Sequence, residues 1–186
     1  MKCVAIGGVP ATGKTTLVKK IYDKMPKINF QYGLVKGHYD KHNNIALLGL
    51  YNQNNTFLGT DRLSMGVNKQ FLQYISMVQR NIIFEGDRLF SLNNLIKLNE
   101  LYDLRIIMLI NSPETLLKRH KDRNDTQTDK FLKGRETKIK NIQEHFGGII
   151  GRIETYTLTN LKESETLSNN IYDWLKTKKG NNGKTT

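Results

Sequence analysis

The chain has 186 residues, of which 38% are hydrophobic and 25% charged, and its 15 glycines and 3 prolines exclude a collagen-like, low-complexity or wholly disordered chain. A single cysteine, Cys3, excludes an internal disulfide and a cysteine-based zinc framework. The 29 Lys and Arg residues outnumber the 17 Asp and Glu residues, and the net charge of +12 favours a polyanionic partner such as nucleic acid.

Short β-rich runs alternate with longer stretches of helical spacing, a pattern typical of an α/β sandwich in which helices cover both faces of a parallel sheet. We expect five core strands at residues 2–7, 31–37, 81–85, 104–111 and 152–157. Helices are expected at about residues 13–24, 67–80, 92–101, 113–123, 129–145 and 164–176. Together these elements predict a single domain over residues 1–177, followed by a flexible basic tail at 178–186.

Two segments depart from this alternation. Residues 45–60 contain two apolar runs around an Asn-rich turn, which predicts a β-hairpin inserted after the second strand and close to substrate. Residues 115–140 form a candidate helical lid, because nine Lys or Arg residues stand between positions 118 and 140 against four acids.

The chain reads GVPATGKT directly after the first expected strand, a full match to the pattern G-x-x-x-x-G-K-[ST]. A loop built on Gly8 and Gly13 turns backbone N–H groups toward phosphate oxygens, and the helix that follows favours negative charge. We expect Lys14 to bind the β- and γ-phosphates, Thr15 to bind Mg²⁺, and Thr16 to reach the α-phosphate. The motif therefore predicts binding of a nucleoside triphosphate such as ATP, together with Mg²⁺.

The strand expected at 81–85 delivers Glu85, Asp87 and Arg88 to its carboxyl edge, where open α/β sheets bind ligands. Glu85 and Asp87 are separated by one residue, so in a strand they face the same side. Either could hold Mg²⁺ or accept the proton of an attacking hydroxyl, and Arg88 is a candidate for substrate binding. The alternative is that Asp87 caps the next turn and pairs with Arg88.

Arg119 and Arg123 lie one helical turn apart, so both could close over ATP and stabilise the transferring phosphoryl group. Farther along the lid, Lys133 and Arg135, with Lys138, are expected to bind phosphates of ATP or of a substrate. The alternative for these cations is a solvated helix face with i,i+4 ion pairs.

Asp61 and Arg62 interrupt an apolar neighbourhood after the expected hairpin. Asp61 could receive the substrate hydroxyl proton and Arg62 could bind a substrate phosphate, or the two could form a helix cap and a surface ion pair. His38 and Tyr39 follow the second expected strand on the acceptor side, where they could contact substrate or be structural.

Four motifs together resemble a family of bacteriophage P-loop kinases that act on 5-hydroxymethyluracil in DNA: GVPATGKTT at 8–16, GTDRLSM at 59–65, FEGDRLF at 84–90 and DTQTDKFLKGRETK at 125–138. The resemblance implies a nucleotide-kinase fold with parallel strands in the order 2-3-1-4-5. It also implies transfer of the ATP γ-phosphate to the hydroxymethyl group of the base, a step of thymidine hypermodification in phage DNA.

Two other hypotheses for the function remain. A nucleoside, nucleotide or polynucleotide kinase would share the phosphate loop, and a P-loop DNA-binding switch would bind ATP without phosphorylating an acceptor. No apolar run approaches the roughly 20 residues of a membrane span, and no signal-peptide pattern is present. We therefore expect a monomeric cytoplasmic protein, in the host cell if it is encoded by a phage, with no membrane partner.

Overall fold

The computed structural model describes residues 1–26, 28–51, 58–122, 129–149 and 151–177. Its centre is a mixed sheet of seven strands in the order β2-β3-β4-β5-β1-β6-β7. The strands are β1 (Lys2–Gly7), β2 (Ile28–Tyr32), β3 (Val35–Asp40), β4 (Ile45–Leu48), β5 (Asn81–Glu85), β6 (Asp103–Ile110) and β7 (Ile153–Thr157). The expected α/β class is confirmed.

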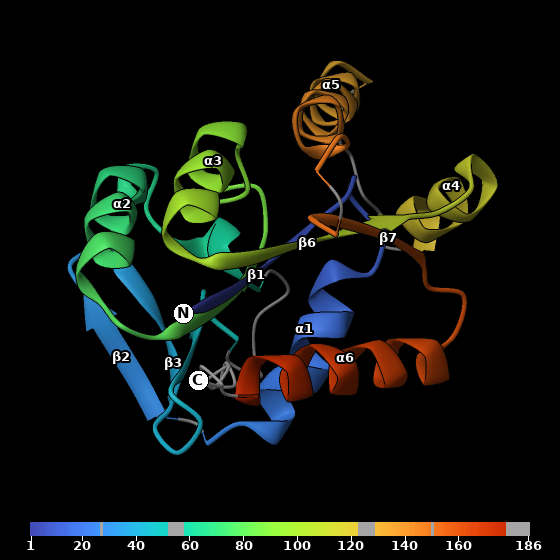
Figure 1. Cartoon of the computed structure of the whole chain (residues 1–186). Helices are drawn as coiled ribbons and strands as arrows, with labels where there is room; N and C mark the ends of the chain where they lie inside the picture. Colours follow the sequence, from blue (N-terminus) through green and yellow to red (C-terminus); the bar gives the residue numbers. More distant parts are fainter. Residues whose placement is uncertain (27, 52–57, 123–128, 150, 178–186) are drawn as a thin grey trace, which may run out of the picture.

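Helices cover both faces of the sheet (Figure 1). Those of the described residues are α1 (Lys14–Lys24), the 3₁₀ turn η1 (Thr60–Arg62), α2 (Val67–Met77), α3 (Leu92–Leu101), α4 (Pro113–Asp122), α5 (Asp129–Phe146) and α6 (Leu161–Lys176). The alternation of β1 explains the layers, because Val4 and Ile6 pack in the cluster with α1 and α6, whereas Cys3 and Ala5 pack in the cluster with α2 and α3. The sheet is therefore buried on both sides.

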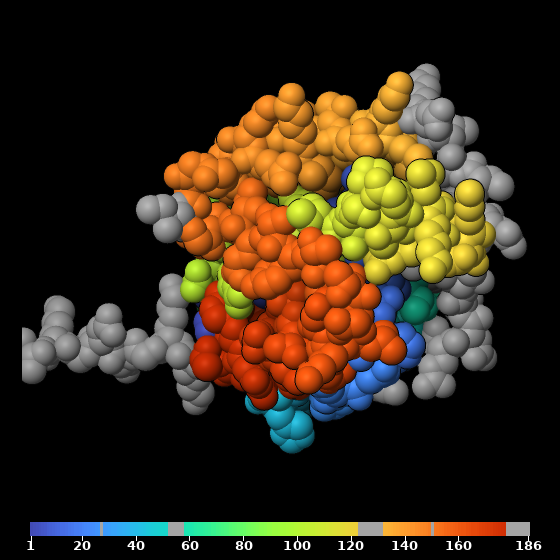
Figure 2. Space-filling model, turned by 90° about the vertical axis from the view of Figure 1, so that its right-hand side faces the viewer, coloured from blue at the N-terminus to red at the C-terminus, as the bar shows by residue number. Residues whose placement is uncertain are grey.

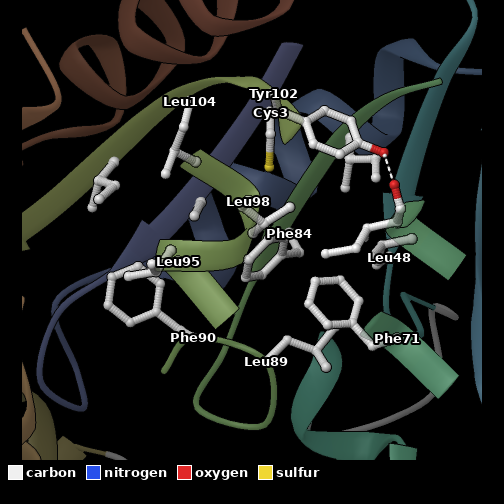
Figure 3. Close-up of a cluster of buried hydrophobic side chains, with 14 of the residues drawn as sticks. Cys3, Leu48, Phe71, Phe84, Leu89, Phe90, Leu95, Leu98, Tyr102 and Leu104 are labelled. Carbon is white, nitrogen blue, oxygen red and sulfur yellow. Dashed lines mark hydrogen bonds between the residues drawn. The ribbon is translucent and has the colours of Figure 1, made fainter. Parts of the chain in front are cut away.

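The apolar cluster between the sheet and helices α2 and α3 fixes β5 in place (Figure 3). Phe84 of β5 meets Phe71 of α2 edge-on, with ring centroids 5.8 Å apart. The Tyr102 hydroxyl donates a 3.0 Å hydrogen bond to the carbonyl oxygen of Ile75, so this buried phenol is paired. Burial of each large apolar side chain stabilises the fold by roughly 1.5–3 kcal/mol. The carboxyl end of β5 is consequently held rigidly beside β1.

The predicted sheet of five parallel strands in the order 2-3-1-4-5 is wrong for the whole sheet, which has seven strands in mixed directions and another order. The five strands that are parallel do follow the order 2-3-1-4-5 when they alone are counted along the chain. β2 and β3 are an antiparallel pair at one edge, and β3 also pairs antiparallel with β4; the other strands, β4-β5-β1-β6-β7, are parallel. The predicted strand at 31–37 spans parts of both β2 and β3 and the turn between them. Apolar periodicity carries no information on strand direction, so it could not separate this hairpin from a parallel strand.

The hairpin predicted at 45–60 is also wrong in its first arm, because Ile45–Leu48 is the fully buried strand β4 between β3 and β5. A short antiparallel bridge follows it, in which Leu50 and Gly59 exchange backbone hydrogen bonds of 3.1 and 2.9 Å. Residues 52–57 between them lie outside the described residues. The segment after β4 therefore returns to the sheet just before η1.

The direction of β3 corrects the expected position of His38 and Tyr39. Their strand runs against β4, so they pair with Leu47 and Ala46 and approach the edge at which the parallel strands begin. His38 is buried, with its ring 4.6 Å from the ring of Tyr22, and the Tyr39 hydroxyl donates to Asn44. Neither residue lies at the carboxyl edge of the parallel strands, where they were expected.

The predicted helices agree with the structure to within a few residues at their ends. The last begins earlier than expected, because the Asn160 side chain accepts the N–H of Glu163 at 2.9 Å and caps α6. Arg123 and the expected tail at 178–186 lie outside the described residues. Across the described part of the chain, every helix is too short or too polar to traverse a lipid bilayer.

Candidate active site

The segment at residues 8–15, called the glycine loop below, contains the connection from β1 to α1 and the first two residues of α1. It has three positive φ angles: Gly8 at 139°, Ala11 at 64° and Gly13 at 99°. A Cβ on Gly8 would lie 2.3 Å from the carbonyl oxygen of Leu109, so a larger residue would collide with β6. The Lys14 ammonium donates to the carbonyl oxygens of Gly8 and Val9 at 2.8 and 2.9 Å. The loop is thus a tight turn with a cation held at its centre.

Glu85 ends β5 beside the glycine loop, because β5 is the parallel neighbour of β1. The Thr15 hydroxyl donates to Glu85 Oε1 over 3.1 Å. Gly59, at a φ of 87°, makes room for this carboxylate, since a Cβ there would lie 2.2 Å from the same oxygen. Glu85 is only 2% exposed, and burial raises its pKa from 4.5 to about 7, although Lys14 opposes the shift.

The raised pKa of Glu85 predicts a stability that falls with rising pH. The folded protein favours the protonated carboxyl, so the contribution is complete below pH 4.5 and is lost as the pH rises through about 7. At about 1.4 kcal/mol per pKa unit, the shift of Glu85 corresponds to roughly 3–4 kcal/mol. We expect Glu85→Gln to lack this fall and to be more stable than the wild type at pH 8.

Urea denaturation of nucleotide-free protein at pH 5 and pH 8 measures this difference. Glu100→Gln is the control, because Glu100 is an exposed residue whose carboxylate pairs with Lys97 on the surface of α3. An identical pH dependence for Glu85→Gln and the wild type would contradict the assignment.

Asp61 lies on η1 close to the carboxyl end of β5. The buried Thr60 hydroxyl donates to the Glu85 carbonyl oxygen at 2.7 Å and anchors the turn, and Asp61 Oδ1 accepts the backbone N–H of Arg88 at 2.9 Å. Desolvation raises the pKa of Asp61, the Arg88 N–H opposes this, and the nearby Asp87 adds to it. Three carboxylates on two segments therefore influence one another at this edge.

Asp87 is paired with cations of α5. Its Oδ2 lies 3.0 Å from Arg135 Nε, and Lys138 Nζ donates to its backbone carbonyl oxygen at 3.0 Å and lies 3.4 Å from Oδ1. Arg88 turns elsewhere, since its guanidinium donates to the Asp61 carbonyl oxygen at 3.3 Å. The helix predicted as a basic lid is thus attached to the acidic edge through Asp87.

A pocket of about 340 Å³ lies on the other side of the glycine loop. Thr12, Gly13 and Thr16 form one wall, the end of α4 a second, and Leu158 to Leu161 with Ser164 a third. The neighbouring hydroxyls of Thr15 and Thr16 therefore serve different sides, because Thr15 reaches Glu85 whereas Thr16 lines the pocket. The loop separates an acidic site from a cavity.

Arg119 connects two walls of this pocket. Its guanidinium donates to the carbonyl oxygens of Ala11 and Leu158, both at 3.1 Å. Arg119 thereby links α4 to the glycine loop and to the segment before α6. Figure 2 shows α4 (yellow) and α6 (orange to red) on the same face. The expected action of Arg119 on the transferring phosphoryl group stays a prediction, since its present contacts lie on the pocket side.

Not all of the site residues predicted from the sequence contact one another in the structure. Arg62 and Lys133 are exposed, and their side chains make no hydrogen bond or ion pair with the other described residues. Sequence reasoning missed Thr60 and Ser164. Thr60 lies in the motif GTDRLSM at 59–65. An Asn-x-x-Glu capping signature at Asn160 would have placed Ser164 in the first turns of α6, beside the pocket.

No protein-family model matches the chain, and no curated protein matches it. Among solved structures, an uncharacterized protein from Eubacterium ventriosum aligns with a TM-score of 0.47 and 11% sequence identity, over 96% of this chain and 100% of its own.

Proposed function

We propose that this protein is an ATP-dependent kinase that transfers the γ-phosphate to the hydroxymethyl group of 5-hydroxymethyluracil in DNA. The observation that carries the proposal is the hydrogen bond from Thr15 of the glycine loop to Glu85, with Lys14 and Asp61 close by. A phosphate cradle and candidate acids thereby meet at one edge of the sheet. The acceptor is assigned from the resemblance of the four sequence motifs.

The two sides of the glycine loop orient the nucleotide. Its reacting end belongs on the side of Thr15 and Glu85, and its nucleoside end belongs in the pocket beside Thr16. The backbone N–H groups of the loop and the N-terminus of α1 bind the phosphates between them. Lys14, which now donates to the carbonyl oxygens of Gly8 and Val9, would turn to the β- and γ-phosphates.

The residues present fit a magnesium ion. The Thr15 hydroxyl and the Glu85 carboxylate are oxygen donors within 3.1 Å of each other, and Mg²⁺ in such sites takes few protein ligands, keeping waters and phosphate oxygens. Within the described residues, no group of three or more His, Cys, Asp or Glu side chains is placed to hold a metal ion. Mg²⁺ bound there would neutralise charge on the phosphates.

Asp61 is the residue we assign to the proton of the acceptor. As the acceptor oxygen bonds to the γ-phosphorus, the bond from phosphorus to the β–γ bridging oxygen breaks, ADP leaves with that electron pair, and the hydroxyl proton passes to Asp61. The Arg88 N–H fixes one oxygen of this carboxylate, and desolvation raises its pKa, which improves it as a base. Asp87 is engaged with Arg135 and Lys138 instead.

Charge supports a polymeric acceptor. The net charge of +12 exceeds what one triphosphate needs, and Arg62 and Lys133 are exposed cations on η1 and α5, the two elements that reach the acidic edge. Lysine and arginine side chains bind the DNA backbone mainly through phosphate contacts, which set position and supply affinity. We assign Arg62 and Lys133 to such contacts.

Transfer of radiolabelled γ-phosphate tests the proposal. With ATP and Mg²⁺, we expect label on DNA that contains 5-hydroxymethyluracil, and none on the same DNA with thymine. Label on the free 5-hydroxymethyl nucleotide but not on the DNA would indicate a nucleotide kinase. ATP-dependent binding to DNA without a labelled acceptor would indicate a switch and would overturn the kinase assignment.

A further inference from the structure

The wall of the pocket beside Thr16 contains a buried hydroxyl with no hydrogen-bond partner. Ser164 of α6 is only 3% exposed, and its Oγ makes no hydrogen bond to any described residue. A buried polar atom left unpaired costs free energy comparable to a lost hydrogen bond, so such groups are uncommon in folded proteins, and at the wall of a pocket a ligand can supply the missing partner. We infer that Ser164 hydrogen-bonds the nucleoside end of the phosphate donor and contributes to its selection.

Three other polar side chains of the pocket wall already make hydrogen bonds within the protein. Thr12, the other buried polar residue of the wall, donates to the Val9 carbonyl oxygen at 2.9 Å. The Asn160 side chain accepts the Glu163 N–H at 2.9 Å, and the Thr159 hydroxyl donates to Glu163 at 3.0 Å. Each of these three side chains thus makes a hydrogen bond within the protein, whereas the Ser164 hydroxyl makes none with the described residues.

The pocket suits a nucleoside in size and chemistry. Its volume of about 340 Å³ falls in the range of roughly 300–1,000 Å³ typical of small-molecule sites. Leu158 and Leu161 supply apolar wall, and the hydroxyl of serine both donates and accepts, so it can meet either kind of group on a base or ribose edge. Staggered positions about its Cα–Cβ bond let it adjust to the ligand.

This inference rests on the proposed function in one respect, that the donor is a nucleoside triphosphate bound at the glycine loop. The role of Ser164 is separated from phosphate binding at the glycine loop by measuring the binding of ATP and of inorganic tripolyphosphate, which lacks the nucleoside. For Ser164→Ala we expect the dissociation constant of ATP to rise about 3- to 10-fold, as the loss of one hydrogen bond implies. Tripolyphosphate binding should be unchanged.

Ser168→Ala is the matched control, because Ser168 is a buried serine of the same helix. Its hydroxyl donates to the Glu165 carbonyl oxygen at 2.8 Å and lies 3.0 Å from Lys24 Nζ. We expect this variant to lose thermal stability but to keep the wild-type preference for ATP. Ser164→Ala, which breaks no hydrogen bond seen in the structure, should melt no lower than the wild type without ligand.

The outcomes are distinct. An unchanged ATP affinity for Ser164→Ala, or equal weakening of ATP and tripolyphosphate, would overturn the role of Ser164 while leaving the kinase proposal intact. Equal affinity of the wild type for ATP and tripolyphosphate would also overturn it, because the pocket would then hold no nucleoside. A wild type that binds neither would refute the proposed function itself.

Discussion

Lys14→Ala is expected to lower phosphoryl transfer by roughly 10²–10³-fold, the usual cost of removing one fixed electrostatic group from a site of charge transfer. Lys14 follows directly on Gly13, which turns the chain at a positive φ, and its ammonium lies within 2.8–2.9 Å of two loop carbonyl oxygens. When a triphosphate binds, this cation would offset charge on the β- and γ-phosphates. The rate of labelled phosphate transfer under saturating ATP measures the loss.

A neighbouring lysine provides the control for this variant. Lys19 lies on the same helix, but its ammonium is 3.4 Å from Asp23 in an exposed i,i+4 pair. Such pairs contribute little, so Lys19→Ala should keep wild-type transfer and stability. Both variants should show the circular dichroism of the wild type. Undiminished transfer by Lys14→Ala would mean that the glycine loop does not hold the donor phosphates.

Local sequence signals predicted the glycine loop and its neighbouring elements well. The run of Gly8 to Thr15 sits between an apolar strand and a helix, and each of these features depends on residues close together in the chain. β5 ends at Glu85 as predicted, since buried strands of β-branched and aromatic residues are bounded by glycine. The acids were therefore found at the correct edge.

Apolar periodicity could not predict which strands pair with one another across the sheet. β2, β3 and β4 are all short and apolar in places, and only their hydrogen-bonded partners decide that the first two form an antiparallel hairpin while Ile45–Leu48 enters the parallel sheet. One misplaced strand moved His38 and Tyr39 to the wrong edge. The ion pairs that attach Arg135 and Lys138 to Asp87 span about 50 residues and have no local signature.

Contacts of the three acids separate roles that the sequence left open. Glu85 is buried against Thr15, which suits a metal ligand; Asp87 is engaged by two cations of α5, which suits a positioning role. Asp61 is exposed as a residue, but its carboxylate is partly desolvated and has one oxygen fixed by the Arg88 N–H. It alone of the three combines access for an acceptor with a carboxylate that makes no ion pair with the described residues.

Asp61→Asn is accordingly expected to lower turnover by about 10²–10⁴-fold, the typical contribution of a general base. The substitution keeps an oxygen that can accept the Arg88 N–H and removes the basic carboxylate, so η1 should retain its position. In the wild type, turnover should fall as the pH drops through the raised pKa of Asp61, because protonation removes the base. The residual activity of Asp61→Asn should lack that dependence.

Asp87→Asn tests whether Asp61 or Asp87 accepts the proton of the acceptor hydroxyl. An asparagine there can still accept a hydrogen bond from Lys138, and the loss of the ion pairs with Arg135 and Lys138 should cost on the order of 1 kcal/mol, so turnover should fall less than about 10-fold. Asp103→Asn serves as the control at the opposite edge, where Asp103 begins β6 beside Arg152. If instead Asp87→Asn loses the pH dependence and Asp61→Asn keeps it, the proton passes to Asp87, and the pairing with α5 must open before each turnover.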